Sequence, residues 1–331
     1  MREAQATEAQ SAGEGSFTYP AGLLHLDRTL ANGQCFRWRR DPAHKNPPPG
    51  EEYWQGIVGG RVLWLARVPG PDSGDDHIAY RVQPSAGQAA DAAWVRAYLR
   101  LDVDLAAIYG DWRIRDPYLG ELTTRLAGLR LVDQEAEECL LSFTCSKANA
   151  IPRIQRAIGE LSRAWGTPIP GGESATYYRF PTAAVLAGLD PTEVAQRTGL
   201  EWRAASLIEV AAQVVARPAG WFDELRDANY TTAHAELTRL RGVGAKIADC
   251  VCAFALDKDQ AVPVDTHVFQ VTRDRYMPEL RGKSLTDALY ARIATFWRGH
   301  FGPYAGWAQQ YLFYDHLLEA RRTGRSPAGL E

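Results

Sequence analysis

A short glycine-rich turn between two helical patterns constrains this chain more than any other stretch. Residues 231–240 and 245–256 each carry apolar side chains at helical spacing, and Gly242-Val243-Gly244 separates them. Glycine tolerates positive φ and lets backbone N–H groups approach an anion closely. The pattern predicts a helix-hairpin-helix over residues 231–256, in which Gly242 and Gly244 form either an ordinary turn or a binding site for a DNA phosphate.

Lys246 falls in the first turn of the second predicted helix. The helix dipole disfavours a cation at this end, and residues 242–256 are otherwise almost wholly small or apolar apart from Asp249. Most lysines on helices are simply solvated. A lysine that is partly removed from water can instead be neutral, and therefore nucleophilic, at working pH. Lys246 is a candidate amine nucleophile.

Asp265 follows in the same segment, after a polar turn and an extended stretch around Pro263. It directly precedes a helical pattern over residues 266–276, where aspartate is a preferred N-cap. A capping carboxylate is ionised and fixed in place, which suits stabilisation of a positive charge that develops on a sugar. The hairpin segment thus contains one candidate nucleophile and one candidate carboxylate.

The composition is typical of a folded protein without a disulfide framework. The chain has 331 residues, a formal net charge of −3 and five scattered cysteines, which suit reduced thiols. Any DNA-binding surface must therefore be local. Basic residues do cluster at 147–163 and at 273–283. The sequence has no apolar run of membrane-spanning length and no recognisable signal peptide, so we expect a cytoplasmic protein, associated with the nucleoid if bacterial.

Strand and helix patterns divide the chain into two domains. A polar tail at residues 1–16 precedes short β segments in residues 17–115, which include a hairpin at Gly59-Gly60 and a short helix at 92–100. Helical patterns dominate residues 116–322, and 323–331 form a second tail. The predicted strands are 53–57, 61–68 and 78–82, and the further helices are 116–126, 134–145, 151–165, 204–216, 284–297 and 304–321. We predict an α+β protein, with an antiparallel sheet domain followed by an all-α domain.

Gln309 and Phe313 lie four residues apart on the last predicted helix, so they share one face. Core packing explains both residues well. An aromatic plane beside an amide is also the pair of groups that could stack on a purine base and read its edge.

Four sequence blocks together resemble the eukaryotic-type 8-oxoguanine DNA glycosylases of the helix-hairpin-helix superfamily. In chain order they are GQCFRW (33–38), ECLLSFTCS (138–146), ALDKDQAVPVD (255–265) and GPYAGWAQQYLF (302–313). The resemblance implies a sheet domain similar to TATA-binding protein, joined to the helical glycosylase domain. It also implies a monomer that repairs oxidised guanine in duplex DNA without a cofactor or a catalytic metal, and it allows a monovalent cation at the hairpin.

The resemblance assigns a role to each matching residue. Lys246 would attack C1′ and form a Schiff base, while Asp265 would assist cleavage of the glycosidic bond. The Gly33 carbonyl would accept from the N7–H of the oxidised base, Gln309 would read its pairing edge, and Phe313 and Cys250 would sandwich it. The expected DNA contacts come from Asn149, Arg153, Trp202, Arg203, Gly242, Gly244 and His267. Of these, Arg153 and Arg203 would recognise the orphaned cytosine, and Trp202 stands at the position of a wedge.

One departure from the family concerns the opposite strand. The family has three consecutive asparagines where this chain has Ala148-Asn149-Ala150. Ala148 therefore replaces the asparagine that would fill the gap opposite the flipped base. We therefore expect a weaker preference for cytosine. Two alternatives remain: an alkylbase glycosylase that acts through water with only the aspartate, and a non-catalytic helix-hairpin-helix DNA-binding protein. Lys246 argues against the first, and Lys246 together with Asp265 argues against the second.

Overall fold

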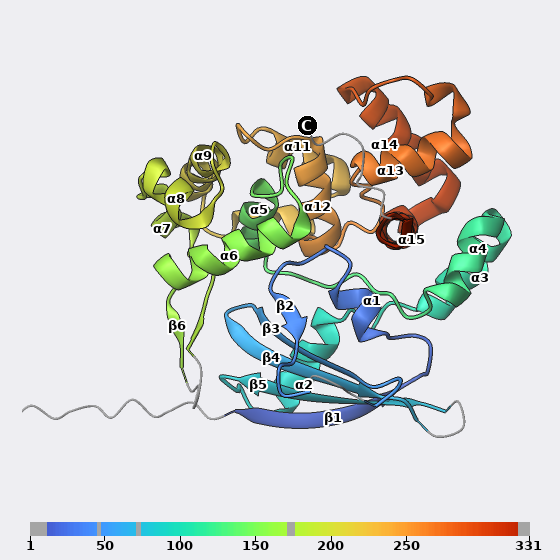
Figure 1. Ribbon diagram of the computed structural model, residues 1–331, viewed down its shortest axis with the longest axis horizontal. Helices are drawn as coiled ribbons and strands as arrows, with labels where there is room; N and C mark the ends of the chain where they lie inside the picture. Colours follow the sequence, from blue (N-terminus) through green and yellow to red (C-terminus); the bar gives the residue numbers. More distant parts are fainter. Residues whose placement is uncertain (1–11, 45–47, 71–73, 171–175, 324–331) are drawn as a thin grey trace, which may run out of the picture.

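The computed structural model describes residues 12–44, 48–70, 74–170 and 176–323. Five antiparallel strands form a sheet in the order β1-β5-β4-β3-β2, at the bottom of Figure 1. They are β1 (Gly13–Tyr19), β2 (Trp38–Arg40), β3 (Glu52–Val58), β4 (Arg61–Val68) and β5 (Asp76–Gln83). The predicted hairpin joins β3 to β4, and Gly59 and Gly60 both have positive φ. The predicted α+β class and the antiparallel sheet are confirmed.

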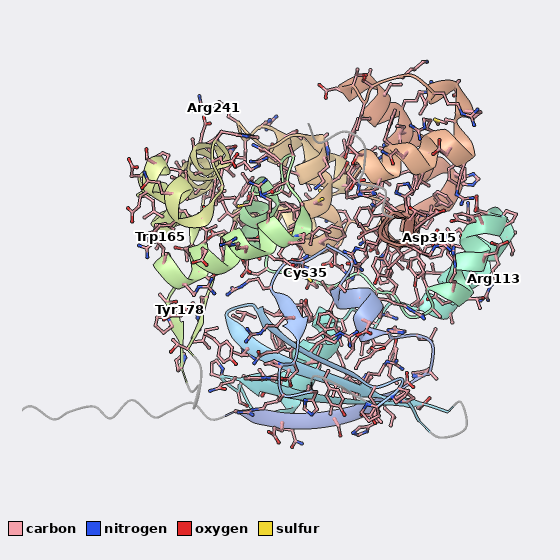
Figure 2. All side chains as sticks on the ribbon, viewed as in Figure 1. Cys35, Arg113, Trp165, Tyr178, Arg241 and Asp315 are labelled. Atoms are coloured by element: carbon pink, nitrogen blue, oxygen red, sulfur yellow. The ribbon has the colours of Figure 1, made fainter. Side chains whose placement is uncertain are left out.

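Helix α2 (Gln88–Tyr98) covers one face of the sheet, where a short helix was predicted at 92–100. Its Val95 and Tyr98 are buried together with Leu63, Leu65 and Val82 of the strands. The short helix α1 (Leu26–Leu30) belongs to the same apolar cluster. Figure 2 shows side chains filling the space between this sheet domain and the helices above it, where Cys35 is labelled.

The sheet domain begins earlier than the sequence predicted. Strand β1 starts at Gly13 and pairs with β5 along its whole length, whereas residues 1–16 were predicted to be a tail. Gly15 is needed for packing in this strand, because a Cβ there would collide with the Tyr80 hydroxyl. The rest of the predicted tail, residues 1–11, lies outside the described residues.

The helices of the second part are arranged above the sheet in Figure 1. They are α3 (Leu105–Arg115), α4 (Pro117–Arg125), α5 (Ala136–Thr144), α6 (Ile151–Trp165), α7 (Ala183–Ala187), α8 (Pro191–Thr198), α9 (Arg203–Val215), α10 (Trp221–Asp227), α11 (Tyr230–Thr238), α12 (Ala245–Ala255), α13 (Thr266–Val271), α14 (Asp287–Phe301) and α15 (Ala305–Thr323). Two short strands, β6 (Pro168–Ile169) and β7 (Tyr177–Tyr178), follow α6 and pair antiparallel. The predicted tail at 323–331 lies outside the described residues, except for Thr323 at the end of α15.

Two expectations for the helical part need correction. The predicted boundary at 115/116 separates α3 from α4, yet Ile108 and Trp112 of α3 are buried in the same cluster as Leu119 of α4. Helix α3 therefore belongs to the helical core. The helix predicted over 266–276 is α-helical only to Val271 and continues as a π-helical turn over Thr272–Tyr276.

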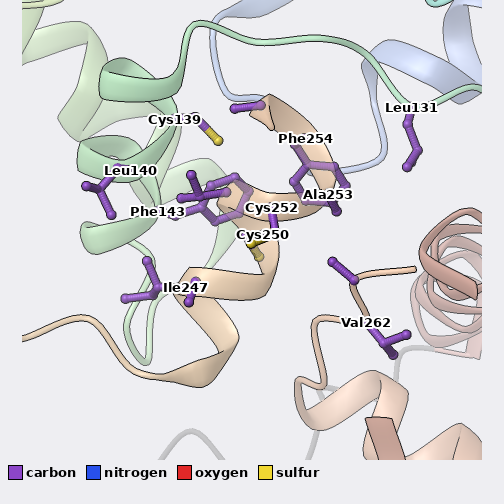
Figure 3. Packing of buried hydrophobic residues seen from close by; sticks show 14 of the residues in the cluster. Leu131, Cys139, Leu140, Phe143, Ile247, Cys250, Cys252, Ala253, Phe254 and Val262 are labelled. Carbon is purple, nitrogen blue, oxygen red and sulfur yellow. The ribbon is translucent and has the colours of Figure 1, made fainter. Parts of the chain in front are cut away.

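Helix α12 passes through the middle of the helical core. All residues from Ile247 to Ala255 are buried, although the sequence suggested burial of one face only. Figure 3 shows Ile247, Cys250 and Phe254 among apolar side chains that include Phe143 of α5. The helix is thus fixed on every side beyond its first turn. No helix among the described residues is long and apolar enough to cross a membrane.

Candidate active site

The predicted helix-hairpin-helix is present, with α11 and α12 on either side of the glycine turn. Gly242 has a φ of +92°, and a Cβ there would lie 3.1 Å from Ser206 Oγ and 3.3 Å from Val210 Cγ2 on α9. Gly244 is the exposed N-cap of α12, and no side chain in the described part of the chain caps the helix. The first N–H groups of α12 are therefore open to an anion such as a phosphate.

Lys147 adds a positive charge beside the hairpin. Its Nζ donates to Ser206 Oγ at 2.5 Å, and a Cβ on Gly242 would lie 3.5 Å from the same Nζ. Burial lowers the pKa of Lys147. The hairpin, α9 and the loop before α6 thus meet at one basic surface.

Lys246 stands at the start of α12, where the helix leaves the core. Its side chain is half-buried, and Nζ lies 5.0 Å from the centre of the Phe143 ring and 3.3 Å from Ser146 Oγ. The centre of the Phe143 ring also lies 5.1 Å from that of Phe36 and 5.7 Å from that of Phe254. Residues from separate sequence blocks therefore hold the amine against an apolar wall, with one hydroxyl partner.

Cys250 lies one turn beyond Lys246 and is buried. Burial raises the pKa of its thiol to about 12, although Lys246 acts in the opposite direction. The thiol is protonated at neutral pH, so it offers a neutral surface rather than a second nucleophile.

Asp265 caps α13, as the sequence predicted. Its Oδ1 accepts from the backbone N–H of Val268 at 2.8 Å, and the residue is half-buried. This bond fixes the carboxylate at the end of the extended segment that follows α12.

A buried hydrogen-bond network ties that extended segment to the helix of Lys246. Asp249, fully buried on α12, accepts from the Tyr290 hydroxyl and, at 2.7 Å, from the Tyr230 hydroxyl. Tyr290 Oη also lies 3.3 Å from Val264 N and from Val262 O. In the sequence, Asp249 stands out only as an acidic residue in an otherwise apolar stretch. Its role in linking α12 to the segment before Asp265 depends on partners far away in the chain.

At the other side of the site, the turn of Gly33 meets helix α15. Gly33 has a φ of +83°, and a Cβ there would lie 2.8 Å from Ile151 Cδ1 and 3.9 Å from Phe313 Cε1. Gln310 Nε2 donates to Asn32 O at 3.2 Å and holds the two segments together. Ile151 opens α6, so Gly33 touches the element that carries Arg153 as well.

Gln34 fixes the same turn from inside the protein. Its buried amide donates to Thr29 O at 2.7 Å and to Arg130 O at 2.8 Å, and it accepts from Val132 N at 2.9 Å. The conformation of the Gly33 turn is therefore set by the protein interior rather than by a ligand.

Gln309 is 3% exposed on α15, and its Oε1 is buried without a hydrogen-bond partner among the described residues. Buried acceptors are nearly always paired, so this oxygen is suited to a donor that arrives with a ligand. Phe313, one turn later, is half-buried and lies edge-on to His267 with ring centres 5.4 Å apart. The Nδ1 of His267 in turn contacts His316, a residue that the sequence analysis did not single out.

The predicted contacts to the opposite strand lie together before α6 and α9. Trp202 is 57% exposed, and the Arg203 guanidinium stacks on its ring at 4.6 Å. Arg203 is buried and donates to the carbonyls of Lys147 and Ala148. Asn149 donates to Cys145 O at 3.2 Å, and its Oδ1 is buried without a partner among the described residues. Glu201, which was not among the predicted site residues, lies between Arg153 and Arg203.

Comparison with known proteins identifies the family. Residues 16–140 match the family model of the N-terminal domain of 8-oxoguanine DNA glycosylase. The chain is 32% identical over 306 residues to the N-glycosylase/DNA lyase OGG1 of Arabidopsis thaliana, and the match covers 90% of this chain and 80% of that protein. The chain belongs to the 8-oxoguanine DNA glycosylase family. A second family member, the N-glycosylase/DNA lyase of Saccharomyces cerevisiae, is 31% identical over 323 residues. That match covers 89% of this chain and 84% of the yeast protein.

Solved structures of 8-oxoguanine glycosylases have the same fold. MBOgg1 in complex with a low affinity DNA ligand superposes with a TM-score of 0.78 at 25% identity, over 94% of this chain and 96% of that one. The Clostridium acetobutylicum 8-oxoguanine glycosylase/lyase, bound to duplex DNA with cytosine opposite 8-oxoguanine, superposes with a TM-score of 0.75 at 27% identity. The match covers 91% of this chain and 93% of that one. A 3-methyladenine glycosylase from Archaeoglobus fulgidus shares the fold, with a TM-score of 0.67, at only 15% identity.

These findings confirm the predicted family and fold class. The roles of the individual site residues stay predictions, as do the monomeric state, the absence of a cofactor and the cation at the hairpin. Among the described residues, no group of three or more His, Cys, Asp or Glu side chains could hold a metal ion.

Proposed function

We propose that this protein releases 8-oxoguanine from duplex DNA and then cleaves the abasic strand, with Lys246 as the nucleophile. The observation that carries the proposal is the position of Lys246 at the open N-terminus of a buried helix, half-buried against Phe143. The relatives in Arabidopsis thaliana and Saccharomyces cerevisiae are named N-glycosylase/DNA lyases. A lyase that acts through an imine needs such an amine.

The chemistry requires no redox step. The lone pair of Lys246 Nζ bonds to C1′ as the C1′–N9 bond breaks, and the base leaves with the bonding electrons and is protonated. Opening of the sugar ring and loss of a proton from nitrogen give an imine. Removal of a C2′ proton then expels the 3′ phosphate by β-elimination, and the DNA strand is cut.

Asp265 supplies a fixed negative charge for the sugar. Positive charge develops at C1′ and the ring oxygen while the glycosidic bond breaks, and a preorganised carboxylate stabilises it without rearranging. Its capping bond to Val268 N and the network of Asp249 and Tyr290 support this arrangement.

The damaged base must leave the duplex before Lys246 can reach its sugar, at a cost of a few kcal/mol. We assign its pocket to Gly33, Cys250, Gln309 and Phe313. The unpaired Oε1 of Gln309 supports this assignment, because the pairing edge of the base carries N–H donors. The carbonyl of Gly33 would accept the N7–H that distinguishes oxidised guanine from guanine.

DNA would lie across the basic surface of the hairpin. Gly242, Gly244 and Lys147 would hold one phosphate region and His267 another, with Trp202 as the wedge that separates the strands. We further propose that the protein acts as a monomer in the cytoplasm, at the nucleoid if bacterial.

Borohydride trapping tests the proposal. Wild-type protein and Lys246→Gln are incubated with duplexes that carry 8-oxoguanine, and borohydride reduces any imine to a stable covalent complex. We expect base release and a complex with the wild type, and neither with the variant. Arg96→Gln, which removes an exposed cation from α2 in the sheet domain, should behave like the wild type.

Other outcomes identify the two alternatives. Base release by Lys246→Gln at the wild-type rate would indicate an enzyme that acts through water. Binding of the duplex without base release by the wild type would indicate a DNA-binding module.

A further inference from the structure

Glu201 occupies the space between the two arginines assigned to the orphaned base. Its Oε1 lies 3.1 Å from Arg153 Nη2, and its Oε2 lies 3.7 Å from Arg203 Nη1. Arg153 belongs to α6, whereas Arg203 begins α9. One carboxylate therefore brings together two guanidinium groups from separate helices.

Two features distinguish this arrangement from an ordinary surface ion pair: the backbone conformation of Glu201 and the fixed position of Arg203. Glu201 has a φ of +55°, in the left-handed region that glutamate rarely adopts. Arg203 cannot move freely, because its guanidinium is buried and bonded to two backbone carbonyls. The Glu201 side chain is still 61% exposed, so an incoming base can reach it.

The three side chains bring one acceptor and two donors together, with Glu201 and Arg153 exposed and Arg203 almost fully buried. Guanine offers cytosine the same set of groups, with O6 as the acceptor and N1–H and N2–H as the donors. Cytosine answers with a donor at N4 and acceptors at N3 and O2. Thymine has an acceptor, O4, where cytosine has the N4 amino group, so its lone pairs would face those of a carboxylate.

We propose that Glu201 is a specificity-determining residue for the base opposite the lesion. Its carboxylate accepts from the N4 amino group of the orphaned cytosine, while Arg153 and Arg203 donate to N3 and O2 of that base. Each carboxylate oxygen has two lone-pair directions, so the contact with an arginine can persist when the base binds. The inference rests on the proposed function and on the placement of the two arginines at the orphaned base.

This role changes the expectation that follows from Ala148. Loss of the asparagine there predicts weaker cytosine preference. Glu201 supplies a separate acceptor for the amino group of cytosine from the loop before α9, which lies near Ala148 because Arg203 bonds to Ala148 O and faces Glu201. Discrimination of cytosine from thymine should therefore survive in the wild-type protein.

A purely electrostatic role makes a different prediction. If Glu201 only neutralised Arg153 and Arg203, its removal would strengthen binding to every duplex equally, because phosphate contacts carry no sequence information. The ratio between opposing bases separates the two roles.

The test measures single-turnover release of 8-oxoguanine opposite cytosine and opposite thymine for the wild type, Glu201→Gln and Glu201→Gly. The amide of glutamine can turn its NH₂ to thymine O4, and glycine removes the acceptor while tolerating the positive φ. We expect the cytosine-to-thymine rate ratio to fall about tenfold in both variants. Glu160→Gln is the matched control, because it removes the same charge from another arginine pair on α6 and should leave the ratio unchanged.

A binding measurement keeps this inference separate from the proposed chemistry. Fluorescence anisotropy at one salt concentration gives the Kd of each variant for a duplex with a stable abasic analogue opposite cytosine or thymine. The same fall in the ratio of affinities is expected. An unchanged ratio in both variants would overturn the role of Glu201, even if all affinities rose together. A wild-type protein that distinguishes the two duplexes but releases no base would contradict the proposed function and leave the Glu201 measurement valid.

Discussion

Nδ1 of His267 lies 2.9 Å from Nδ1 of His316, beside the Phe313 ring. One nitrogen must donate and the other accept, so the two rings cannot both be protonated while this bond exists. Burial and then the neighbouring His267 lower the pKa of His316, while Glu319, Asp265 and Asp274 act to raise it. The pair therefore favours a neutral His316 in the folded protein.

The His267–His316 pair predicts a pH-dependent stability. Because the folded pKa of His316 is below its ordinary value of 6.5, the unfolded chain binds the proton more readily. This contribution to stability is complete above about pH 6.5 and is lost as pH falls through the folded pKa. Urea unfolding of the wild type and of His316→Asn from about pH 8 to about pH 5 should show a smaller loss for the variant. Equal losses would contradict the prediction.

Gly33→Ala should destabilise the protein and impair base recognition together. The added Cβ would lie 2.8 Å from Ile151 Cδ1, at a φ of +83°. We expect a loss of about 2 kcal/mol from the free energy of unfolding and a large fall in 8-oxoguanine release. Ile151→Val removes the Cδ1 atom, so the double variant should recover the steric part of the loss but not the backbone part. Urea unfolding and single-turnover kinetics measure both effects, and a fully active Gly33→Ala would contradict the assignment of this turn to the pocket.

Tyr290→Phe tests whether the Asp249 network positions the segment before Asp265. The change leaves Asp249 with one tyrosine partner and removes the contacts of Tyr290 Oη with Val262 and Val264. We expect a loss of about 1–3 kcal/mol of stability and a slower glycosylase step. Tyr230→Phe is the matched control, because Tyr230 bonds to the same carboxylate without touching that segment. It should lower stability similarly and leave the rate closer to that of the wild type. Equal rates for the two variants would remove the positioning role.

Local patterns in the sequence were sufficient for much of the fold. Helix α6 and strand β4 match their predicted ranges of 151–165 and 61–68, because each has a complete apolar period and clear ends. The α11–α12 hairpin followed from two glycines between helical patterns. Membership of the glycosylase family was also predictable, since four separate blocks match it in order.

The features that were missed depend on contacts between distant residues. Strand β1 pairs with β5 from Gly13 onward and Tyr80 packs against Gly15, and no local signal reveals these partners. Glu201 and His316 each have a partner far away in the chain, Arg153 and His267, which lie 48 and 49 positions away. Sequence periodicity carries no information on such pairs.

Ala148→Asn should stabilise the protein and sharpen its choice of opposing base. Ala148 has a φ of +43°, a left-handed conformation that asparagine adopts more readily than alanine. We expect a gain of about 0.5 kcal/mol in the free energy of unfolding, measured by urea denaturation. The family resemblance further predicts that the new side chain fills the gap left by the flipped base, so release opposite cytosine should rise relative to release opposite thymine.

Ala148→Gly separates these two effects of the asparagine. Glycine relieves the same backbone strain without adding a side chain, so it should leave the cytosine-to-thymine ratio as in the wild type. If the asparagine and glycine variants changed the ratio equally, the effect would come from the backbone of the loop that Arg203 holds through Ala148 O.

An asparagine variant less stable than the wild type would mean that the exposed position has no room for the longer side chain beside Arg203. A higher ratio for asparagine alone would place residue 148 and Glu201 on the same orphaned base, where their effects on the ratio should not add, because neighbouring contacts to one group couple.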